Sequence, residues 1–199
     1  MGIQSLIADF DAVLMTASNS RRVTMLRQVT DLFLRGASSY SDDQVAVFGL
    51  IIKILIEKVE RQALIELSGR LASTDTSPPD VVNRLSRDDD IAIAGPILER
   101  SNALSEKDIL EIAETKGQGY LLAIACRKQI SETISDILIS RGTPEVLRKT
   151  IGNECARISE IGYVKLIGQA KNDRDLAELI ANREDIPAEL QPFLRLARA

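Results

Sequence analysis

PDVVNRLSRDDDIAIAGPILERSNALSEKDIL, residues 79–110, decides the fold because parts of it recur further along the chain. A short apolar segment, residues 81–85, is followed by three consecutive aspartates, and a second apolar segment then ends at Arg100. Apolar side chains three and four positions apart share one face of a helix. The stretch therefore predicts two helices joined by an acidic turn, which together form one structural unit.

Two other parts of the chain repeat this pattern. Residues 79–84 (PDVVNR) correspond to residues 144–149 (PEVLRK), and residues 124–138 (IACRKQISETISDIL) correspond to residues 180–194 (IANREDIPAELQPFL) in their apolar, basic and helix-start positions. Residues 98–110 fit the second pattern with one extra residue. A repeated unit of this size cannot bury its apolar face alone, so neighbouring units are expected to stack into a continuous core.

These residues resemble a known family. Paired short helices with a Pro-Asp/Glu-Val start, an Asp/Asn turn and a closing basic residue are similar to HEAT-type repeats. Residues 79–114 and 121–131 resemble a bacterial HEAT-like family, domain of unknown function 2336, over roughly residues 21–190. Pro96, early in its helix, resembles the kink of many HEAT helices. The resemblance implies a fold, and the family has no established catalytic residues to transfer.

The expected fold is all-α: a right-handed α-solenoid of HEAT-like antiparallel helix pairs, with roughly 65 to 75% helix and no sheet. The segment TDTSPP, residues 74–79, is the clearest boundary in the chain. It predicts an N-terminal helical subdomain over residues 1–75 and HEAT-like helical repeats over residues 76–199, packed as one continuous domain.

Several helix starts can be predicted from capping residues. Helices are expected over residues 3–15 and 21–34, the second capped by Ser20. Ser77 is expected to cap the helix after the boundary, with Pro78 at the first helical position, where the missing N–H is tolerated.

Ser41 and Gln44 match a capping box, which opens a helix over residues 45–56. No proline separates this helix from the apolar positions after Val59, so one long helix and two shorter ones both fit the sequence. Packing favours a break.

Composition excludes several classes of function. The chain has no histidine, which removes the usual general base and the commonest metal ligand. Cys126 and Cys155 stand apart in apolar patterns, so we expect both to be small core residues of a reduced cytoplasmic protein. We therefore expect no catalytic residues, no metal and no cofactor.

Nothing in the sequence predicts export or membrane insertion. Asp9 and Asp11 lie where a signal peptide would be apolar. The most apolar run, residues 45–56, contains Lys53 and is shorter than the ~20 residues that a membrane span needs. A buried helix is the better interpretation.

Two further motifs each have a functional and a simpler structural interpretation. Asp88, Asp89 and Asp90 carry the carboxylates that Mg²⁺ or Ca²⁺ prefers, but acidic residues before a helix also cap its free N–H groups, and we favour capping. Residues 117–120 (GQGY) resemble a nucleotide loop, but no strand precedes them and the third glycine is missing. We expect a turn between helices there.

Three arginines, Arg100, Arg127 and Arg183, occupy similar positions in the repeated pattern. They could bind a phosphate or an acidic peptide on one surface. They could also bond carbonyls or carboxylates of the next unit as an inter-repeat ladder. Repetition favours the ladder, because a binding site rarely needs the same residue in every unit.

The leading functional hypothesis is a non-enzymatic protein-interaction scaffold or adaptor with an unidentified protein or peptide partner. One alternative is a HEAT-like DNA-binding or alkylated-base repair protein, and another is a regulatory N-terminal domain of a longer signalling protein. The net charge of −4 and the absence of Trp disfavour nucleic acid as partner.

The helix over residues 45–56 bears on assembly. Val45, Phe48, Ile52 and Leu55 form one apolar stripe, but further apolar residues occupy much of the remaining circumference. Such a helix must be covered on several sides. We favour burial within a monomer and keep a homodimer through the N-terminal subdomain as the alternative.

Overall fold

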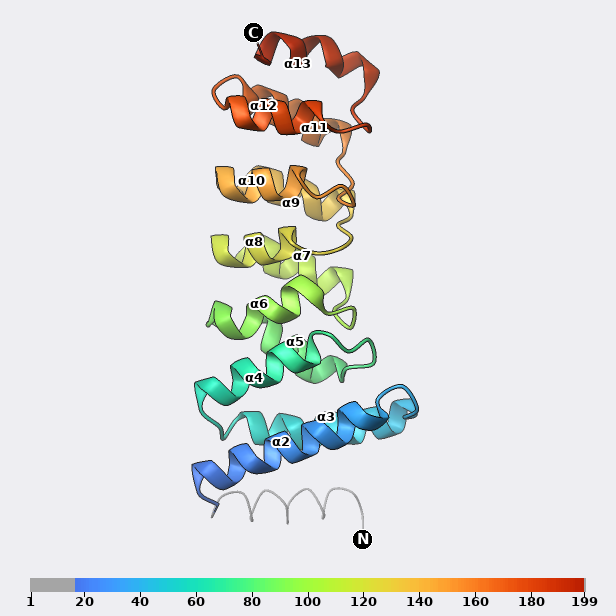
Figure 1. Cartoon of the computed structure of the whole chain (residues 1–199), viewed down its shortest axis with the longest axis vertical. Helices are drawn as coiled ribbons and strands as arrows, with labels where there is room; N and C mark the ends of the chain where they lie inside the picture. Colours follow the sequence, from blue (N-terminus) through green and yellow to red (C-terminus); the bar gives the residue numbers. More distant parts are fainter. Residues whose placement is uncertain (1–16, 199) are drawn as a thin grey trace. The chain divides into compact units, whose positions relative to one another are not determined.

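The computed structural model describes residues 17–198, and 70% of these residues are helical. Within this range the extended pairing is limited to one isolated parallel bridge between Ile130 and Ala156. The helix expected over residues 3–15 lies outside the described residues. The elements, labelled in Figure 1, are α2 (Asn19–Gly36), α3 (Asp42–Ile56), α4 (Arg61–Leu71), α5 (Pro79–Ser86), α6 (Ile91–Arg100), α7 (Glu106–Thr115), α8 (Gln118–Ala125), α9 (Glu132–Arg141), α10 (Pro144–Ile151), α11 (Glu160–Ala170), α12 (Arg174–Ala181), the 3₁₀ helix η1 (Ala188–Leu190) and α13 (Gln191–Arg198).

The chain forms two compact units that divide between Ser105 and Glu106. The expected boundary at residues 75/76 instead lies inside the first unit, because α4 and α6 pack together across it. The buried hydroxyl of Ser68 donates to the main-chain carbonyl of Ile93, and Arg61 pairs with Asp90. These contacts join the last helix before the proline-rich segment to the second helix after it.

In the first unit, α2, α4 and α6 contact one another in series, and α3 packs against α2 and α5. The capping box is confirmed: the Ser41 N–H donates to Oε1 of Gln44 at 2.9 Å, and the Gln44 N–H donates to Ser41 Oγ at 3.4 Å. The break is also confirmed, since α3 ends at Ile56 and α4 begins at Arg61. The local sequence rules therefore predict this part of the unit well.

Two of the predicted caps are wrong. The second helix begins at Asn19, and Ser18, not Ser20, accepts the N–H of Arg21 at 3.3 Å. The helix after the boundary has Pro79 as its first residue, and Ser77 instead donates its hydroxyl to the carbonyl of Leu71 at 2.8 Å. In both places several small polar residues or prolines are adjacent in the sequence, so capping rules alone do not identify the residue that precedes the helix.

The apolar helix α3 is covered on part of its circumference. Ile52 and Leu55 are fully buried, and the half-buried ring of Phe48 packs in an aromatic cluster with Phe33 and Tyr40. Val47 and Leu50 remain 44% and 41% exposed. Burial within the chain therefore accounts for one face of α3 but not for the other.

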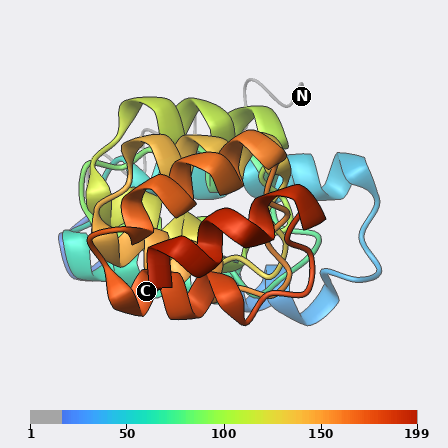
Figure 2. The same ribbon diagram turned by 90° about the horizontal axis from the view of Figure 1, so that it is seen from above.

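In the second unit, α8, α10 and α12 form one layer and α7, α9, α11 and α13 form the other. Figure 2 looks onto this unit from its α13 end. The first layer repeats at Gln118, Pro144 and Arg174, which are 26 and 30 residues apart. The two segments that correspond in sequence, residues 124–138 and 180–194, are therefore two repeats apart, and the sequence comparison did not detect the shorter spacing of one repeat.

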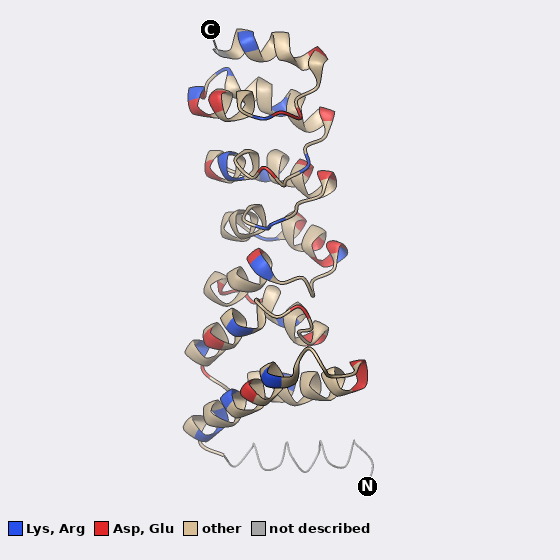
Figure 3. Ribbon diagram, turned by 45° about the vertical axis from the view of Figure 1, so that its right-hand side comes forward, with Lys and Arg blue, Asp and Glu red and all other residues tan. Residues whose placement is uncertain are grey.

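Leu, Ile, Val and Ala side chains dominate the buried core of both units, and Tyr163 is among the largest fully buried side chains. Lys and Arg are interspersed with Asp and Glu along the helices (Figure 3). Among the described residues, no helix is both long and apolar enough to cross a membrane.

Candidate functional site

A pocket of about 480 Å³ lies in the second unit, at the C-terminal ends of α8 and α10. Four of its lining residues are basic, and none is Asp or Glu. We call it the basic pocket. Its lining residues are Ala125, Cys126, Arg127, Lys128, Arg148, Lys149, Gly152, Asn153 and Cys155.

The basic residues come from two Arg-Lys pairs, one after the end of α8 and one inside the last turn of α10. Arg127 and Lys128 follow the end of α8, and Arg148 and Lys149 lie in the last turn of α10. Cations at a helix C-terminus interact favourably with the helix dipole, which explains each pair separately. Stacking of α8 against α10 brings the two pairs to one pocket.

The four cations differ in their surroundings. Burial lowers the pKa of the half-buried Arg127 guanidinium. Arg148 pairs through Nη2 with Oδ2 of Asp173 at 2.7 Å, while its buried Nε has no acceptor among the described residues. Lys128 and Lys149 are exposed. The pocket thus combines two half-buried guanidiniums with two exposed ammonium groups.

Asn153 connects the two sides of the basic pocket. Its Nδ2 donates to the carbonyls of Ala125 at 3.3 Å and Arg127 at 2.6 Å, and its Oδ1 accepts the N–H of Cys155 at 3.1 Å. The side chain therefore satisfies carbonyls at the end of α8 that have no partner within the helix. It also fixes the segment after α10 against the segment after α8.

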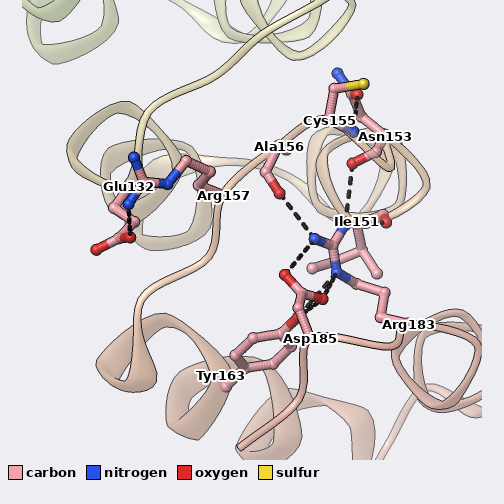
Figure 4. A network of polar contacts seen from close by, with 9 residues as sticks. All are labelled: Glu132, Ile151, Asn153, Cys155, Ala156, Arg157, Tyr163, Arg183 and Asp185. Carbon is pink, nitrogen blue, oxygen red and sulfur yellow. Dashed lines mark hydrogen bonds and ion pairs between the residues drawn. The ribbon is translucent and has the colours of Figure 1, made fainter.

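Arg183, two residues after α12, holds the segment that carries Asn153 (Figure 4). Its guanidinium donates to the main-chain carbonyls of Ile151 at 3.1 Å, Asn153 at 3.0 Å and Ala156 at 2.8 Å. The side chain is only 8% exposed. One arginine therefore satisfies three carbonyls of the previous repeat and fixes the loop behind the basic pocket.

A carboxylate and a phenol complete the surroundings of Arg183. Asp185 accepts from Nε at 2.8 Å and from Nη2 at 2.7 Å, and the Tyr163 hydroxyl accepts from Nε at 2.8 Å while donating to Asp185 at 2.6 Å. Burial and the bond to Asp185 raise the pKa of Tyr163. Burial alone would raise the pKa of Asp185, but bonds from Arg183 and Tyr163 outweigh it and lower that pKa.

Residues 93–194 match the model of a family described as an uncharacterised protein conserved in bacteria, domain of unknown function 2336 (DUF2336). The chain belongs to the DUF2336 family. No curated protein and no solved structure matches it. The basic pocket and the Arg183 network both lie inside the DUF2336 segment.

Within the DUF2336 segment, the three arginines expected to act alike lie in different surroundings. Arg127 lines the basic pocket, Arg183 contacts the previous repeat, and Arg100 is exposed as the last residue of α6. Arg127 and Arg183 each lie two residues beyond a helix end, whereas Arg100 is still helical. Arg127 and Arg183 therefore have different surroundings within the second unit, and Arg100 belongs to the first unit.

The prediction that both cysteines are buried core residues is wrong. Cys126 is half-buried and Cys155 is exposed, and both line the basic pocket. The apolar pattern around Cys155 lies in the segment that connects α10 to α11. Neighbouring apolar residues of this loop, such as Ala156, are buried without being helical.

The two other motifs have structural roles. Asp90 caps α6, with its Oδ1 accepting the N–H of Ala92 at 3.0 Å, and Asp88 accepts the N–H of Asp90 at 3.0 Å. Gly117 precedes the first residue of α8, so the GQGY segment is a turn that continues into a helix. In the part of the chain that the structure describes, no group of three or more acidic or Cys side chains could hold a metal ion.

Sequence reasoning singled out Arg127 but not Lys128, Arg148 or Lys149. The available signal was the Arg-Lys dipeptide, which occurs at residues 127–128 and again at 148–149. Each follows or ends a short apolar helix. The two dipeptides are 21 residues apart, whereas α8 and α10 are offset by 26 residues, so the repeat alone does not align them. The packing of α8 against α10 brings them to one pocket.

Proposed function

We propose that this chain is a non-enzymatic interaction module that binds an acidic segment of a partner protein at the basic pocket. One observation supports it: four basic side chains line a concave site without any carboxylate, in a chain whose net charge is −4. We further propose that the helix pairs follow the right-handed order of HEAT-like repeats, with the helix ends of one layer forming the recognition edge.

Charge complementarity alone gives modest affinity. An exposed ion pair contributes about 0.2–1 kcal/mol, so four such pairs contribute a few kcal/mol at most. A dissociation constant of 1 µM needs about 8 kcal/mol. The remaining free energy has to come from main-chain and apolar contacts of the partner, and a protein segment offers both.

Nucleic acid is the competing ligand, because phosphates also seek clustered Lys and Arg. Proteins that bind single strands without sequence preference add aromatic side chains on which bases stack. The lining of the basic pocket contains no aromatic residue. We therefore favour a protein segment, and binding of DNA serves as one arm of the test.

Fluorescence anisotropy measures the affinity of the chain for three fluorescein-labelled ligands. These are a Glu-rich nonapeptide pool, a neutral nonapeptide pool and a single-stranded oligonucleotide. The Glu-rich pool is expected to bind the chain with at least tenfold higher affinity than the neutral pool. Lys128→Glu with Lys149→Glu should abolish that preference. Equal binding of both pools, or tighter binding of the oligonucleotide, would overturn the proposal.

A matched control separates a local effect from net charge. Lys107→Glu with Lys171→Glu makes the same change in net charge, and neither residue lines the basic pocket. Both lysines are exposed, as are Lys128 and Lys149. The control variant should keep most of the affinity. Equal losses in the two double variants would mean that long-range charge, not the pocket, attracts the peptide.

A further inference from the structure

We infer that the basic pocket recognises a phosphorylated side chain of the partner, in preference to an ordinary carboxylate. The inference rests on the proposed function and names the ligand class of the same site. It starts from the number and kind of cations around the pocket: two guanidiniums, Arg127 and Arg148, and two ammonium groups, Lys128 and Lys149.

The charge of the lining exceeds what one carboxylate can balance. A carboxylate carries one negative charge and two acceptor oxygens, whereas a phosphomonoester carries about −1.5 to −2 at pH 7 and three acceptor oxygens. The lining holds four basic residues and no acidic one, and Arg148 among them also pairs with Asp173, which lies outside the lining. A phosphate dianion is closer to this lining in charge and in acceptors.

The guanidiniums favour an oxyanion with several oxygens. Their planar donors bind phosphate in a two-point arrangement that an ammonium group cannot form. In its present position Arg148 leaves its buried Nε without an acceptor among the described residues. An unsatisfied buried donor is unfavourable, which lowers the cost of turning this guanidinium toward a phosphate.

The pocket also has a suitable size. Small-molecule sites usually measure about 300–1,000 Å³. At about 480 Å³, the basic pocket has room for a phosphorylated side chain together with part of its main chain. Asn153 fixes both of its sides, so the cations are held on a preformed frame.

Fluorescence anisotropy with three pools of nonapeptides tests the inference. The pools have randomised flanks and differ only in the central residue, which is Ser, Glu or phosphoserine. The phosphoserine pool is expected to bind at least tenfold more tightly than the Glu pool. Equal affinity for the Glu and phosphoserine pools would overturn the inference and leave the proposed function standing. Failure of both pools to bind better than the Ser pool would overturn both proposals.

Arg148 variants test the geometry. Arg148→Lys keeps the charge and removes the planar fork, so it should reduce the preference for phosphoserine over Glu by about fivefold or more. Arg157→Lys makes the same exchange at an exposed residue outside the basic pocket and should leave that preference intact. Circular dichroism must show both variants folded with thermal midpoints close to the parent's. An undiminished preference in a folded Arg148→Lys variant would overturn the role of the guanidinium.

The pH dependence of binding distinguishes recognition of a phosphate from a purely structural role of these residues. The second pKa of a phosphomonoester is near 6, and the chain has no histidine to titrate in the same range. Affinity for the phosphoserine pool should fall severalfold from pH 7 to pH 5.5, while affinity for the Glu pool stays constant. Parallel falls for both pools would contradict a phosphate dianion as ligand.

Discussion

Asn153 and Arg183 occupy the same place in successive repeats, each two residues beyond the end of its helix. Asn153 donates to the carbonyls of Ala125 and Arg127 at the end of α8, and Arg183 donates to those of Ile151 and Asn153 at the end of α10. In each case the two acceptors are the last residue of a helix and the residue two positions after it. The unmatched carbonyls at one helix end are thus satisfied by the following repeat.

Arg183→Gln should destabilise the second unit by about 2–4 kcal/mol, because it leaves buried carbonyls without a charged donor. The matched control is Arg157→Gln, which removes an exposed pair with Glu132 and should cost about 0–1 kcal/mol. Urea denaturation followed by circular dichroism measures both. A similar small cost for the two variants would contradict the structural role of Arg183.

Asp185 should make stability depend on acid pH. Its folded pKa is lowered below the usual value of 3.8, so its contribution is fully present above that value and is lost as pH falls through the folded pKa. The difference in free energy of unfolding between parent and Asp185→Asn should therefore be constant from pH 7 to about 5 and shrink below the usual Asp pKa of ~3.9. A difference independent of pH down to acid unfolding would refute this.

Tyr163 should act at the alkaline end. Its folded pKa is raised above the usual 10.0, so its contribution is present below that pH and is lost as pH rises further. The parent should lose stability above pH 10 more steeply than Tyr163→Phe, which has no phenol to ionise. Thermal unfolding at several pH values measures this, and parallel alkaline curves would contradict it.

The parts of the fold that depend on local chemistry could be predicted from the sequence. The all-helical class, the Ser41 and Gln44 capping box and the break before Arg61 follow from spacing and capping rules. The basic pocket could not, because it depends on which helix lies beside which. Arg127, beyond the end of α8, and Arg148, within α10, line one pocket because α8 packs against α10, and local sequence rules do not reveal that packing.

Gly162→Ala should destabilise the second unit by about 1–3 kcal/mol, since an added methyl group would lie 2.9 Å from Oδ1 of Asp136 and 3.1 Å from Ile139 Cδ1. Gly168 lies in the same helix with nothing within 4 Å of such a group. Gly168→Ala should therefore stabilise by about 0.5–1 kcal/mol through helix propensity. Opposite signs in thermal unfolding are expected, and equal signs would contradict the close packing of α11 on α9.

Phe48→Glu should destabilise the first unit by several kcal/mol, because it breaks the aromatic cluster with Phe33 and Tyr40. Leu50→Glu, on the exposed face of α3, should leave the stability of a monomer unchanged. Light scattering after gel filtration tests assembly: a parent dimer that Leu50→Glu converts to a monomer would support the homodimer, whereas a monomeric parent would exclude it. Equal stability of the two variants would contradict the burial of Phe48.

The direction of the contacts made by Asn153 and Arg183 has a consequence for synthesis on the ribosome. Each donor lies C-terminal to the carbonyls that it satisfies, so a repeat that has just emerged still lacks the side chain that completes its helix end. The segment after α10 becomes fully bonded only when residues up to Asp185 have left the exit tunnel. Nascent chains arrested just before Arg183 should therefore expose this loop to proteases, and chains arrested a few residues after the network has emerged should protect it.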